Sequence, residues 1–294
     1  MVDAAPPHRS GVVALLGRPN AGKSSLLNRL IGAKLAIVTP KPQTTRGRLL
    51  GVLTLEGAQV LLHDTPGIHP GRGELHAAMQ RAAAEAAEGC DLALILVDGT
   101  RGWEPAHDAL AARLAVPWLA VRTKLDLARA PKGPWPPPAT AGASGQLEVS
   151  AATGQGIDAL LREVVARLPE GPAFYPPDDL TDRSLRFLAA ELVREAAFGL
   201  LEEELPYSIA VEVEEFDEKT RPDLVRIRAN LLVARASQKR IVIGSGGEMI
   251  REIGTRARRG IEQLLERRVH LELWVKIEPG WAKRRRRVEG LGYV

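Results

Sequence analysis

The sequence predicts an α/β domain, built on a mostly parallel sheet with helices on both faces, followed by a smaller α+β domain. Three observations support this prediction. The chain has 294 residues, enough for about two domains with a core each. Short apolar runs alternate with helix-like stretches up to about residue 168, which is typical of parallel sheets. A proline-rich break at 171–179 then precedes a different order of elements.

The elements of the first domain follow from apolar periodicity. We expect strands at 12–16, 60–62, 92–97, 116–121 and 147–149, and helices at 24–31, 74–88, 105–114 and 157–168. The stretch 130–145 is rich in proline and glycine and is expected to be an irregular surface loop. Because ligands bind at the carboxyl ends of strands in such sheets, the segments that follow these runs are candidate sites.

The second domain is expected after a linker at 173–182, so that the first covers 1–172 and the second 183–294 with a basic C-terminal tail. Its expected elements are a helix at 183–205, strands at 207–216 and 224–233, a glycine-rich turn flanked by helix, a helix at 255–268 and a strand at 269–277. This order predicts a small sheet with its helices on one side.

Charge is segregated along the chain. The formal net charge is +4, but residues 1–172 carry +3, residues 173–223 carry −9 and residues 224–294 carry +10. A basic block of this size predicts a polyanionic partner for the C-terminal end. The acidic side chains of the preceding helix (Glu191, Glu195 and 202–204) are expected to face solvent.

Composition argues against several classes of protein. A hydrophobic content of 45% and a charged content of 26% are those of a folded chain. The apolar run 92–97 is far shorter than the roughly 18 residues of a membrane-spanning helix, and residues 1–10 lack the features of a signal peptide. Cys90 is the one cysteine, so an internal disulfide cannot form, and we expect a cytoplasmic protein with Cys90 buried.

The first motif is Gly17-Arg18-Pro19-Asn20-Ala21-Gly22-Lys23-Ser24. It has the spacing of a phosphate-binding loop and lies between a predicted strand and a predicted helix, which is the context that such a loop requires. Its backbone N–H groups are expected to face phosphate oxygens at the helix N-terminus. Lys23 would reach the β- and γ-phosphates, and the Ser24 hydroxyl would bind Mg²⁺.

Three further motifs follow predicted strands. They are Asp64-Thr65-Pro66-Gly67, Thr123-Lys124-Leu125-Asp126 and Ser150-Ala151-Ala152. Asp64 can hold Mg²⁺ through water, and Gly67 allows a backbone N–H to approach a γ-phosphate. The Asp126 carboxylate can accept from two N–H groups of guanine but not from adenine, and 150–152 can support the base. Alone, residues 64–67 are also compatible with an ordinary turn, and residues 150–152 would carry no signal.

Together these motifs resemble the nucleotide-binding domain of the translation-factor-related GTPases, over about residues 10–170. The stretch Lys41-Pro42-Gln43-Thr44-Thr45-Arg46-Gly47-Arg48 is similar to the first switch segment of the Era family. The resemblance implies that Thr45, with Thr44 beside it, coordinates Mg²⁺ when the γ-phosphate is present. It also implies GTP hydrolysis with catalytic roles for Lys23, Thr45, Gly67 and Asn20. An ordinary polar loop at the surface is the alternative for the two threonines.

Two residues depart from the GTPase pattern. Thr123 replaces the usual asparagine of the guanine motif, keeping a hydroxyl but losing the amide. Ile68, which belongs to the expected nucleotide site, replaces the glutamine that orients the attacking water in Ras-like proteins. We therefore expect slow intrinsic turnover. The water would be positioned by switch backbone groups, by a partner, or by a K⁺ ion near Asn20, for which a loop-stabilising asparagine is the alternative.

The stretch 238–250 carries a Gly-x-x-Gly turn, Gly244-Ser245-Gly246-Gly247, between an apolar stretch and a helix. With the surrounding order of elements it resembles the nucleic-acid loop of a KH domain, which clamps unpaired nucleotides. Because Ser245 and Gly246 are uncharged, phosphate attraction would fall to neighbouring basic residues: Lys239, Arg240, Arg251, Arg256, Arg258 and Arg259. A solvated side chain on a helix face is the alternative for each of them. The expected RNA-binding set is Lys239, Arg240, Ile243, 244–247 and Arg251. The tail 283–287 is either a phosphate contact or a solvated charge run.

The same order of elements, and the closing stretch 269–277, resemble the KH domain at the C-terminus of the Era family. That resemblance implies a monomeric GTP switch that binds single-stranded 16S rRNA near its 3′ end during assembly of the small (30S) ribosomal subunit. A GTPase whose basic domain binds a protein or an anionic membrane surface, with a peripheral fraction at the inner face of the cell membrane, remains an alternative. An RNA chaperone with a structural nucleotide is another.

Overall fold

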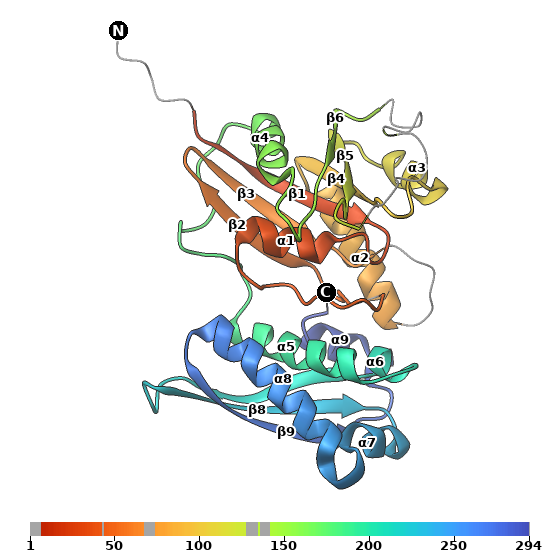
Figure 1. The fold of residues 1–294 in the computed structure, drawn as a ribbon, viewed down its shortest axis with the longest axis vertical. Helices are drawn as coiled ribbons and strands as arrows, with labels where there is room; N and C mark the ends of the chain where they lie inside the picture. The colour runs from red at the N-terminus through yellow and green to blue at the C-terminus, as the bar shows by residue number, and fades with distance from the viewer. Residues whose placement is uncertain (1–6, 43, 68–73, 128–134, 136–141, 294) are drawn as a thin grey trace. The chain divides into compact units, whose positions relative to one another are not determined.

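Two separate sheets organise the chain in the computed structural model, which describes residues 7–42, 44–67, 74–127, 135 and 142–293 (Figure 1). The chain divides into two units. The first takes the described parts of 1–36, 45–70 and 79–182, and the second takes those of 37–44, 71–78 and 183–294. Most of the expected loop at 130–145 lies outside the described residues.

The first unit is a six-stranded sheet in the order β2-β3-β1-β4-β5-β6. Every neighbouring pair is parallel except β2 with β3, which is antiparallel. Its elements are β1 (Arg9–Gly17), α1 (Lys23–Ile31), β2 (Leu49–Leu55), β3 (Ala58–Asp64), α2 (Glu74–Glu88), β4 (Leu92–Asp98), α3 (Pro105–Ala111), β5 (Trp118–Thr123), β6 (Gly145–Glu148) and α4 (Ile157–Arg167). The first residues of α2, 74–78, belong to the second unit. The α/β prediction for this half of the chain is confirmed.

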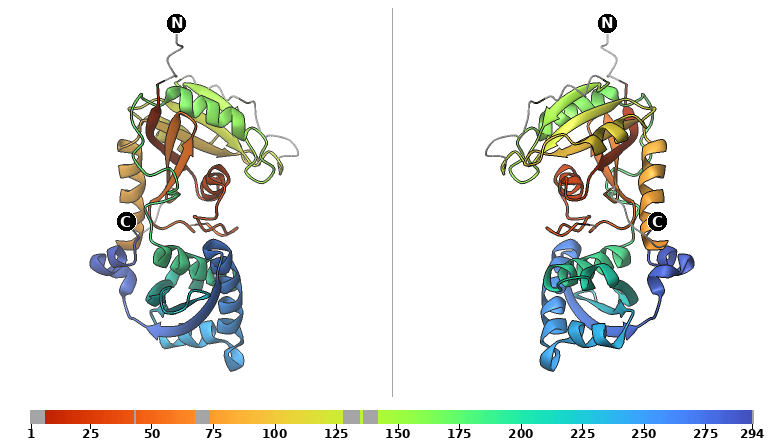
Figure 2. Two further views of the ribbon diagram at one scale, coloured as in Figure 1. Left: turned by 90° about the vertical axis from the view of Figure 1, so that its left-hand side faces the viewer. Right: turned by 90° about the vertical axis from the view of Figure 1, so that its right-hand side faces the viewer.

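The central strands are apolar along their whole length because both faces of the sheet are covered. Residues 92–97 of β4 are fully buried. One face packs through Ala14, Leu16 and Ile95 against α2 and α3, and α1 lies on the opposite face (Figure 2). The segments that follow β1, β3 and β5 therefore leave the sheet at its carboxyl edge, where the motifs were expected.

The second unit contains a three-stranded sheet in the order β7-β8-β9. Strand β8 pairs antiparallel with β7 and parallel with β9. Its elements are α5 (Leu185–Leu200), α6 (Leu205–Ser208), β7 (Ala210–Asp217), β8 (Leu224–Val233), α7 (Ala236–Ile243), η2 (Ser245–Gly247), α8 (Glu248–Leu265), β9 (Arg268–Ile277), η3 (Trp281–Lys283) and α9 (Arg285–Gly290). Helices α5 and α8 cover one face of this sheet and share its core, as the α+β prediction required (Figure 1).

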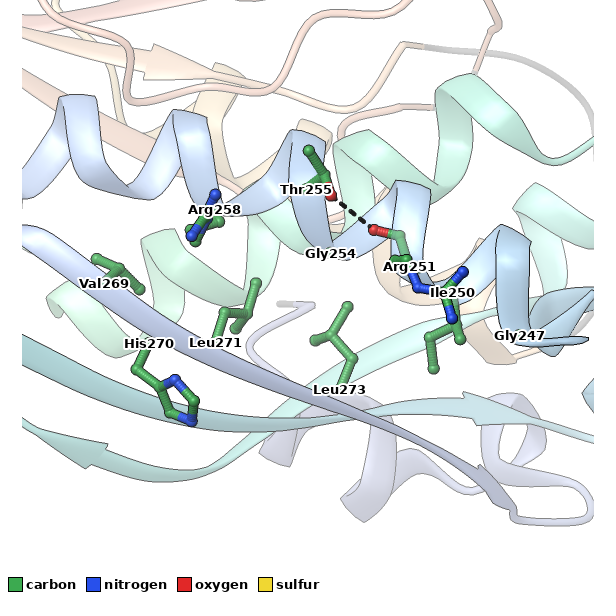
Figure 3. Close-up of a pocket in the computed structure, with 10 residues that line it drawn as sticks. All are labelled: Gly247, Ile250, Arg251, Gly254, Thr255, Arg258, Val269, His270, Leu271 and Leu273. Carbon is green, nitrogen blue, oxygen red and sulfur yellow. Dashed lines mark hydrogen bonds between the residues drawn. The ribbon is translucent and has the colours of Figure 1, made fainter.

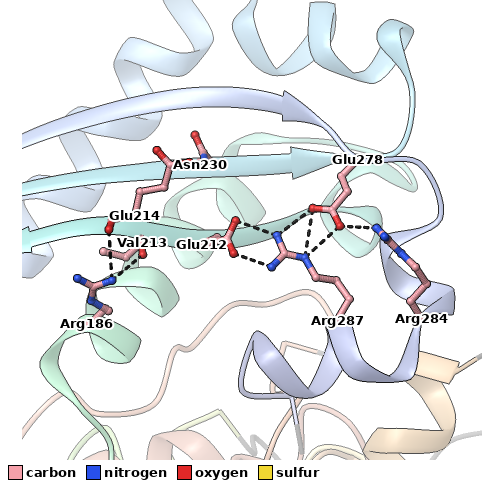
Figure 4. Close-up of polar contacts among 8 residues, drawn as sticks. All are labelled: Arg186, Glu212, Val213, Glu214, Asn230, Glu278, Arg284 and Arg287. Carbon is pink, nitrogen blue, oxygen red and sulfur yellow. Dashed lines mark hydrogen bonds and ion pairs between the residues drawn. The ribbon is translucent and has the colours of Figure 1, made fainter.

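The C-terminal tail is folded onto the second unit. Trp281, Val288 and Tyr293 are almost fully buried in a cluster with Ala210 and Leu232. The basic run in this tail is paired as well: Arg287 bonds both carboxylate oxygens of Glu212 at 2.6 and 2.8 Å, and also pairs with Glu278, which Arg284 joins (Figure 4). Arg287 is therefore held within the second unit, whereas residues 283–286 of the run are exposed.

Several expected boundaries differ from the structure. Strand β2 was not predicted, and the helix expected at 183–205 ends at Leu200 because the chain turns before the short helix α6. Helix α8 begins at Glu248, seven residues before the expected start at residue 255. The expected linker lies along the first sheet: Gln59 accepts hydrogen bonds from the N–H groups of Phe174 and Tyr175. No helix within the described ranges has both the length and the apolar character to span a bilayer.

Candidate nucleotide and nucleic-acid sites

The phosphate-binding loop joins β1 to α1. Gly17 and Gly22 have φ of 148° and 91°, and a Cβ at Gly17 would lie 2.6 Å from the Leu96 carbonyl oxygen, so only glycine fits there. Lys23 opens α1 and is 5% exposed; its Nζ donates to the carbonyl oxygens of Gly17 at 3.2 Å and Arg18 at 3.0 Å. Burial lowers the pKa of Lys23 to about 8, against the opposing pull of Asp64. A buried cation at a helix N-terminus is suited to a polyphosphate.

Three oxygen donors meet beside this lysine. Ser24 Oγ donates to Asp64 Oδ2 at 2.6 Å and lies 2.9 Å from Thr45 Oγ1. Thr45 Oγ1 lies 3.3 Å from the same carboxylate oxygen. Asp64 is fully buried; burial raises its pKa, while Lys23 and the two hydroxyls oppose the rise.

This donor set fits Mg²⁺. Two hydroxyls and a carboxylate are the hard oxygen ligands that Mg²⁺ prefers, and Asp64 Oδ1 is buried without a hydrogen-bond partner. A cation beside the carboxylate would also remove the cost of burying its charge. No group of three His, Cys, Asp or Glu side chains that could hold a metal gathers anywhere in the described part of the chain, so this site depends on its two hydroxyls.

The segment after β3 is held against the phosphate loop. Thr65 Oγ1 donates to the Leu15 carbonyl at 2.7 Å, which joins the ends of β3 and β1. A Cβ at Gly67 would lie 2.6 Å from the backbone nitrogen of Pro19, so the two backbones are already at their closest approach. Pro66 lies between Thr65 and Gly67, and Ile68 lies outside the described residues.

Thr123, which stands where the guanine motif usually has asparagine, is hydrogen-bonded to the phosphate loop. Its Oγ1 donates to the Ala21 carbonyl at 2.7 Å and lies 3.2 Å from the Val97 carbonyl. A threonine at this position can therefore hold the loop against the end of β5. Lys124 has φ of 59° and its Nζ pairs with Asp98 at 2.6 Å. The sequence analysis did not predict Asp98 as a site residue. It nevertheless follows the apolar run of β4, just as the other site residues follow the apolar runs of their strands.

The Asp126 carboxylate, which is expected to bind the base, is oriented by the loop after β6. Ser150 Oγ donates to Asp126 Oδ1 at 2.6 Å and accepts from the Thr153 N–H at 3.1 Å. Ser150 is fully buried, whereas Ala151 and Ala152 lie in the turn that follows. Leu125 lies between the residues of this motif, and its N–H is 3.4 Å from the Val149 carbonyl. The remaining oxygen of Asp126 can accept from guanine.

Arg18 and Asn20 are two further polar residues of the phosphate-binding loop. The Arg18 side chain pairs with Glu104, so its charge is directed to the segment before α3. Asn20 has φ of 62°, a left-handed conformation that asparagine tolerates better than most residues.

The glycine turn of the second unit joins α7 to α8. A Cβ at Gly244 would lie 2.7 Å from Met249 Cβ and 2.8 Å from its backbone nitrogen. Gly246 and Gly247 have φ of 56° and 80°, and a Cβ at either would meet nothing within 4 Å; Gly246 is exposed and Gly247 is half-buried. Ser245 begins the intervening turn η2. The turn therefore presents exposed backbone, as a phosphate chain requires.

A groove of about 540 Å³ continues from this turn between α8 and β9 (Figure 3). Apolar side chains form its floor, and the rim carries two arginines and a histidine. Its lining residues are Gly247, Ile250, Arg251, Gly254, Thr255, Arg258, Val269, His270, Leu271 and Leu273. Of the expected RNA set, Gly247 and Arg251 line it; Lys239, Arg240 and Ile243 lie on α7 and do not. Arg258, expected as one of the basic neighbours of the turn, also lines the groove. The β9 wall was not predicted, because a groove between two elements leaves no local motif.

Comparison with known proteins places this geometry in a family. A model described as 50S ribosome-binding GTPase matches residues 12–124, and a KH domain model matches residues 204–282. The chain is 44% identical to GTPase Era of Nitratidesulfovibrio vulgaris (strain DP4), over 98% of this chain and 96% of that one. The chain belongs to the Era family of GTPases. It is also 42% identical to GTPase Era of Geobacter metallireducens over 98% of this chain.

Two solved Era structures share the fold. A complex of Era with MgGDPNP and nucleotides 1506–1542 of 16S ribosomal RNA superposes with a TM-score of 0.89 at 37% identity, over 98% of this chain and 99% of that one. A point variant of Aquifex aeolicus Era bound to GDP.AlF4⁻ superposes with a TM-score of 0.90 at 37% identity, over 97% of this chain and 99% of that one. The Era resemblance drawn from the motifs is confirmed.

Proposed function

We propose that this Era-family chain is a GTP-binding and GTP-hydrolysing switch that binds single-stranded 16S rRNA near its 3′ end and acts in 30S subunit assembly. The observation that carries the nucleotide half is the cluster of the Ser24 and Thr45 hydroxyls around the buried Asp64 carboxylate, beside the buried Lys23. The solved Era complex with MgGDPNP and 16S rRNA nucleotides supports the RNA half. We propose that the GTP-binding domain covers residues 1–172, the linker residues 173–182 and the RNA-binding domain residues 183–294.

In this proposal each motif meets one part of the nucleotide. The backbone of residues 17–22 and the Lys23 ammonium bind the phosphates, and Ser24, Thr45 and Asp64 hold Mg²⁺, Asp64 through water. A bound Mg²⁺ neutralises charge on the phosphate oxygens. The Gly67 N–H contacts the γ-phosphate. Thr45 and Gly67 lose their contacts once that phosphate leaves, which relaxes both switch segments.

Guanine selectivity rests on Asp126. Because Ser150 holds one carboxylate oxygen, the other is aimed for the N–H groups at the guanine edge. We expect Asp126→Asn to lower affinity for GTP and raise it for xanthosine triphosphate, measured by competition with a fluorescent nucleotide. Ser150→Ala is the matched control, since it loosens the carboxylate without changing its preference. Unchanged GTP affinity in Asp126→Asn would contradict the guanine assignment.

Hydrolysis is expected to be slow because Ile68 can neither donate nor accept a hydrogen bond. We propose that Asn20 contributes to a K⁺ site that helps to position the attacking water. Single-turnover hydrolysis should then be faster in KCl than in NaCl, and Asn20→Ala should remove that difference while GDP affinity stays unchanged. Fast turnover that is equal in both salts would contradict the proposal.

The RNA site combines the turn 244–247 with the groove. Phosphates pass over the open backbone of Gly246 and Gly247, and bases enter the apolar groove under Arg251 and Arg258. Lys239, Arg240 and Ile243 are proposed to contact RNA at the α7 side of the turn. A KH-type site of this kind selects unpaired nucleotides, whereas a bare charge patch does not.

The test is titration of the full chain with short single-stranded RNAs at several salt concentrations. We expect sequence-selective affinity that persists as salt rises, and a loss of about tenfold in Arg258→Gln. Arg256→Gln is the matched control, because Arg256 lies on the same helix but pairs with Glu252 at 2.7 Å. Sequence-blind binding that vanishes with salt, together with binding to anionic vesicles, would support the membrane alternative instead.

A further inference from the structure

The segment that precedes Thr45 is held by helix α5. Three contacts do this: the Val38 N–H donates to Glu195 Oε1 at 2.8 Å, Lys41 Nζ donates to the Phe198 carbonyl at 2.8 Å, and the Arg194 guanidinium reaches the Thr44 carbonyl. The Lys41 ammonium therefore caps the carboxyl end of α5, where a positive charge is favoured.

Arg194 is the most unusual of these anchors. Its side chain is fully buried, with Nε donating to Glu191 Oε1 at 2.7 Å and Nη2 donating to the Thr44 carbonyl at 2.7 Å. The guanidinium carbon also lies 5.9 Å from the ring centre of Phe198 and 5.8 Å from that of Tyr293. Burial alone would lower the pKa of Arg194, but Glu191 raises it, so the group stays charged.

A buried ion pair of this kind adds little net stability compared with an apolar side chain of the same shape. The Arg194 guanidinium instead provides a hydrogen bond to a residue outside helix α5. The Thr44 carbonyl and the Thr45 N–H belong to one planar peptide unit, so fixing that carbonyl orients the backbone that leads to Thr45. Thr45 Oγ1 then lies 2.9 Å from Ser24 Oγ, in the proposed Mg²⁺ donor set.

We propose that Arg194 is a positioning residue for the Mg²⁺-binding threonine: its bond to the Thr44 carbonyl orders the first switch segment for GTP. The inference rests on the proposed role of Thr45. Arg194 lies on α5, the first helix of the proposed RNA-binding domain. Helix α5 therefore contributes to the difference in affinity between GTP and GDP. By linkage, whatever shifts α5 changes the preference for GTP, and GTP acts on α5 in return.

The test compares affinities of the full chain for GDPNP and GDP in Mg²⁺. Arg194→Met keeps the length of the side chain and removes both donors, and should lower GDPNP affinity about tenfold while GDP affinity changes less than twofold. The concentration of Mg²⁺ needed for half-maximal GDPNP binding should rise. Arg186→Met is the matched control: Arg186 is on the same helix and donates to the Val213 carbonyl at 3.1 Å, outside the switch segment.

Thr45→Ala separates this inference from the proposed function. It should lower the GDPNP-to-GDP affinity ratio by itself, and adding Arg194→Met should then lower the ratio no further, because the arginine acts through the threonine. An additive double variant, or an unchanged ratio in Arg194→Met alone, would overturn the role of Arg194. An unchanged ratio in Thr45→Ala would overturn the role of Thr45 first.

Arg194→Lys covers the case in which the methionine variant does not fold. A lysine keeps the positive charge, but its single ammonium lacks the planar fork of donors with which the guanidinium bonds Glu191 and the Thr44 carbonyl together. We expect it to fold and to lower the ratio about threefold, which is smaller than the methionine effect. A folded lysine variant with the ratio of the parent would count against the proposal.

Discussion

Thr123→Val tests how this chain replaces the usual asparagine of the guanine motif. The change is isosteric and removes only the hydroxyl that donates to the Ala21 carbonyl at 2.7 Å. Thr123 is 4% exposed, so the carbonyl is left without a donor in a buried place, at a cost of about 2 kcal/mol. Because Ala21 is part of the phosphate loop, a loop released by this loss must be reordered when nucleotide binds. The loss of nucleotide affinity is therefore at most the full ~2 kcal/mol, which corresponds to about 30-fold.

The loss should be the same for GDP and GDPNP, since both nucleotides engage the loop through the phosphates they share. Fluorescence titration with each labelled nucleotide measures it. Thr181→Val is the matched control, because the Thr181 hydroxyl also bonds a backbone carbonyl, that of Leu50 at 2.6 Å on β2, away from the loop. Affinities within twofold of the parent for both nucleotides would refute the idea that Thr123 holds the loop.

Gly244→Ala should destabilise the second unit by about 2–4 kcal/mol, because its Cβ would meet the Met249 backbone at 2.8 Å and φ is 75°. Gly246→Ala, in open space, should cost about 1 kcal/mol; equal hydrogen-exchange rates across α8 in the two variants would contradict this. Lys23, with a pKa of about 8, should take up about half a proton when GTP binds at pH 8, so GTP affinity should fall as pH rises above 8. Calorimetry in buffers of different ionisation enthalpy measures that uptake, and none at pH 8 would contradict it. Arg287→Gln removes ion pairs to two glutamates and should cost about 1–2 kcal/mol of stability while RNA affinity stays within twofold; a weaker salt dependence of RNA binding would instead make the tail a phosphate contact.

The nucleotide site was predictable because each motif is local and ends a strand. A parallel sheet brings those ends together whatever the details of the helices. Strand β2 was missed, although a signal was present: Leu55 pairs with Ala58 across a two-residue turn in which Gly57 has φ of 75°, and glycine in such a turn is typical of a hairpin.

Contacts between distant segments left no such signal. Arg194 and Thr44 are 150 residues apart in the chain, and neither belongs to a periodic pattern that marks the pair. Glu191 and Glu195 were expected to face solvent, because charged residues on a helix usually do. The Glu191 side chain is only 13% exposed and pairs with the buried Arg194, so that expectation was wrong for Glu191. Glu195 stays partly exposed while it accepts from the Val38 N–H, and residues 202–204 are exposed as expected.

Formal charge overstates the basic surface for the same reason. Residues 224–294 carry +10, but Arg284 and Arg287 are paired with Glu278 and Glu212, one of which lies in the acidic block before them. A charge that is already matched by a neighbouring carboxylate attracts a polyanion weakly. The basic side chains beside the glycine turn and the groove are Lys239 and Arg240 on α7 and Arg251 and Arg258 on α8. The surface offered to RNA is therefore narrower than the charge count implies, and lies where the glycine turn and the groove meet.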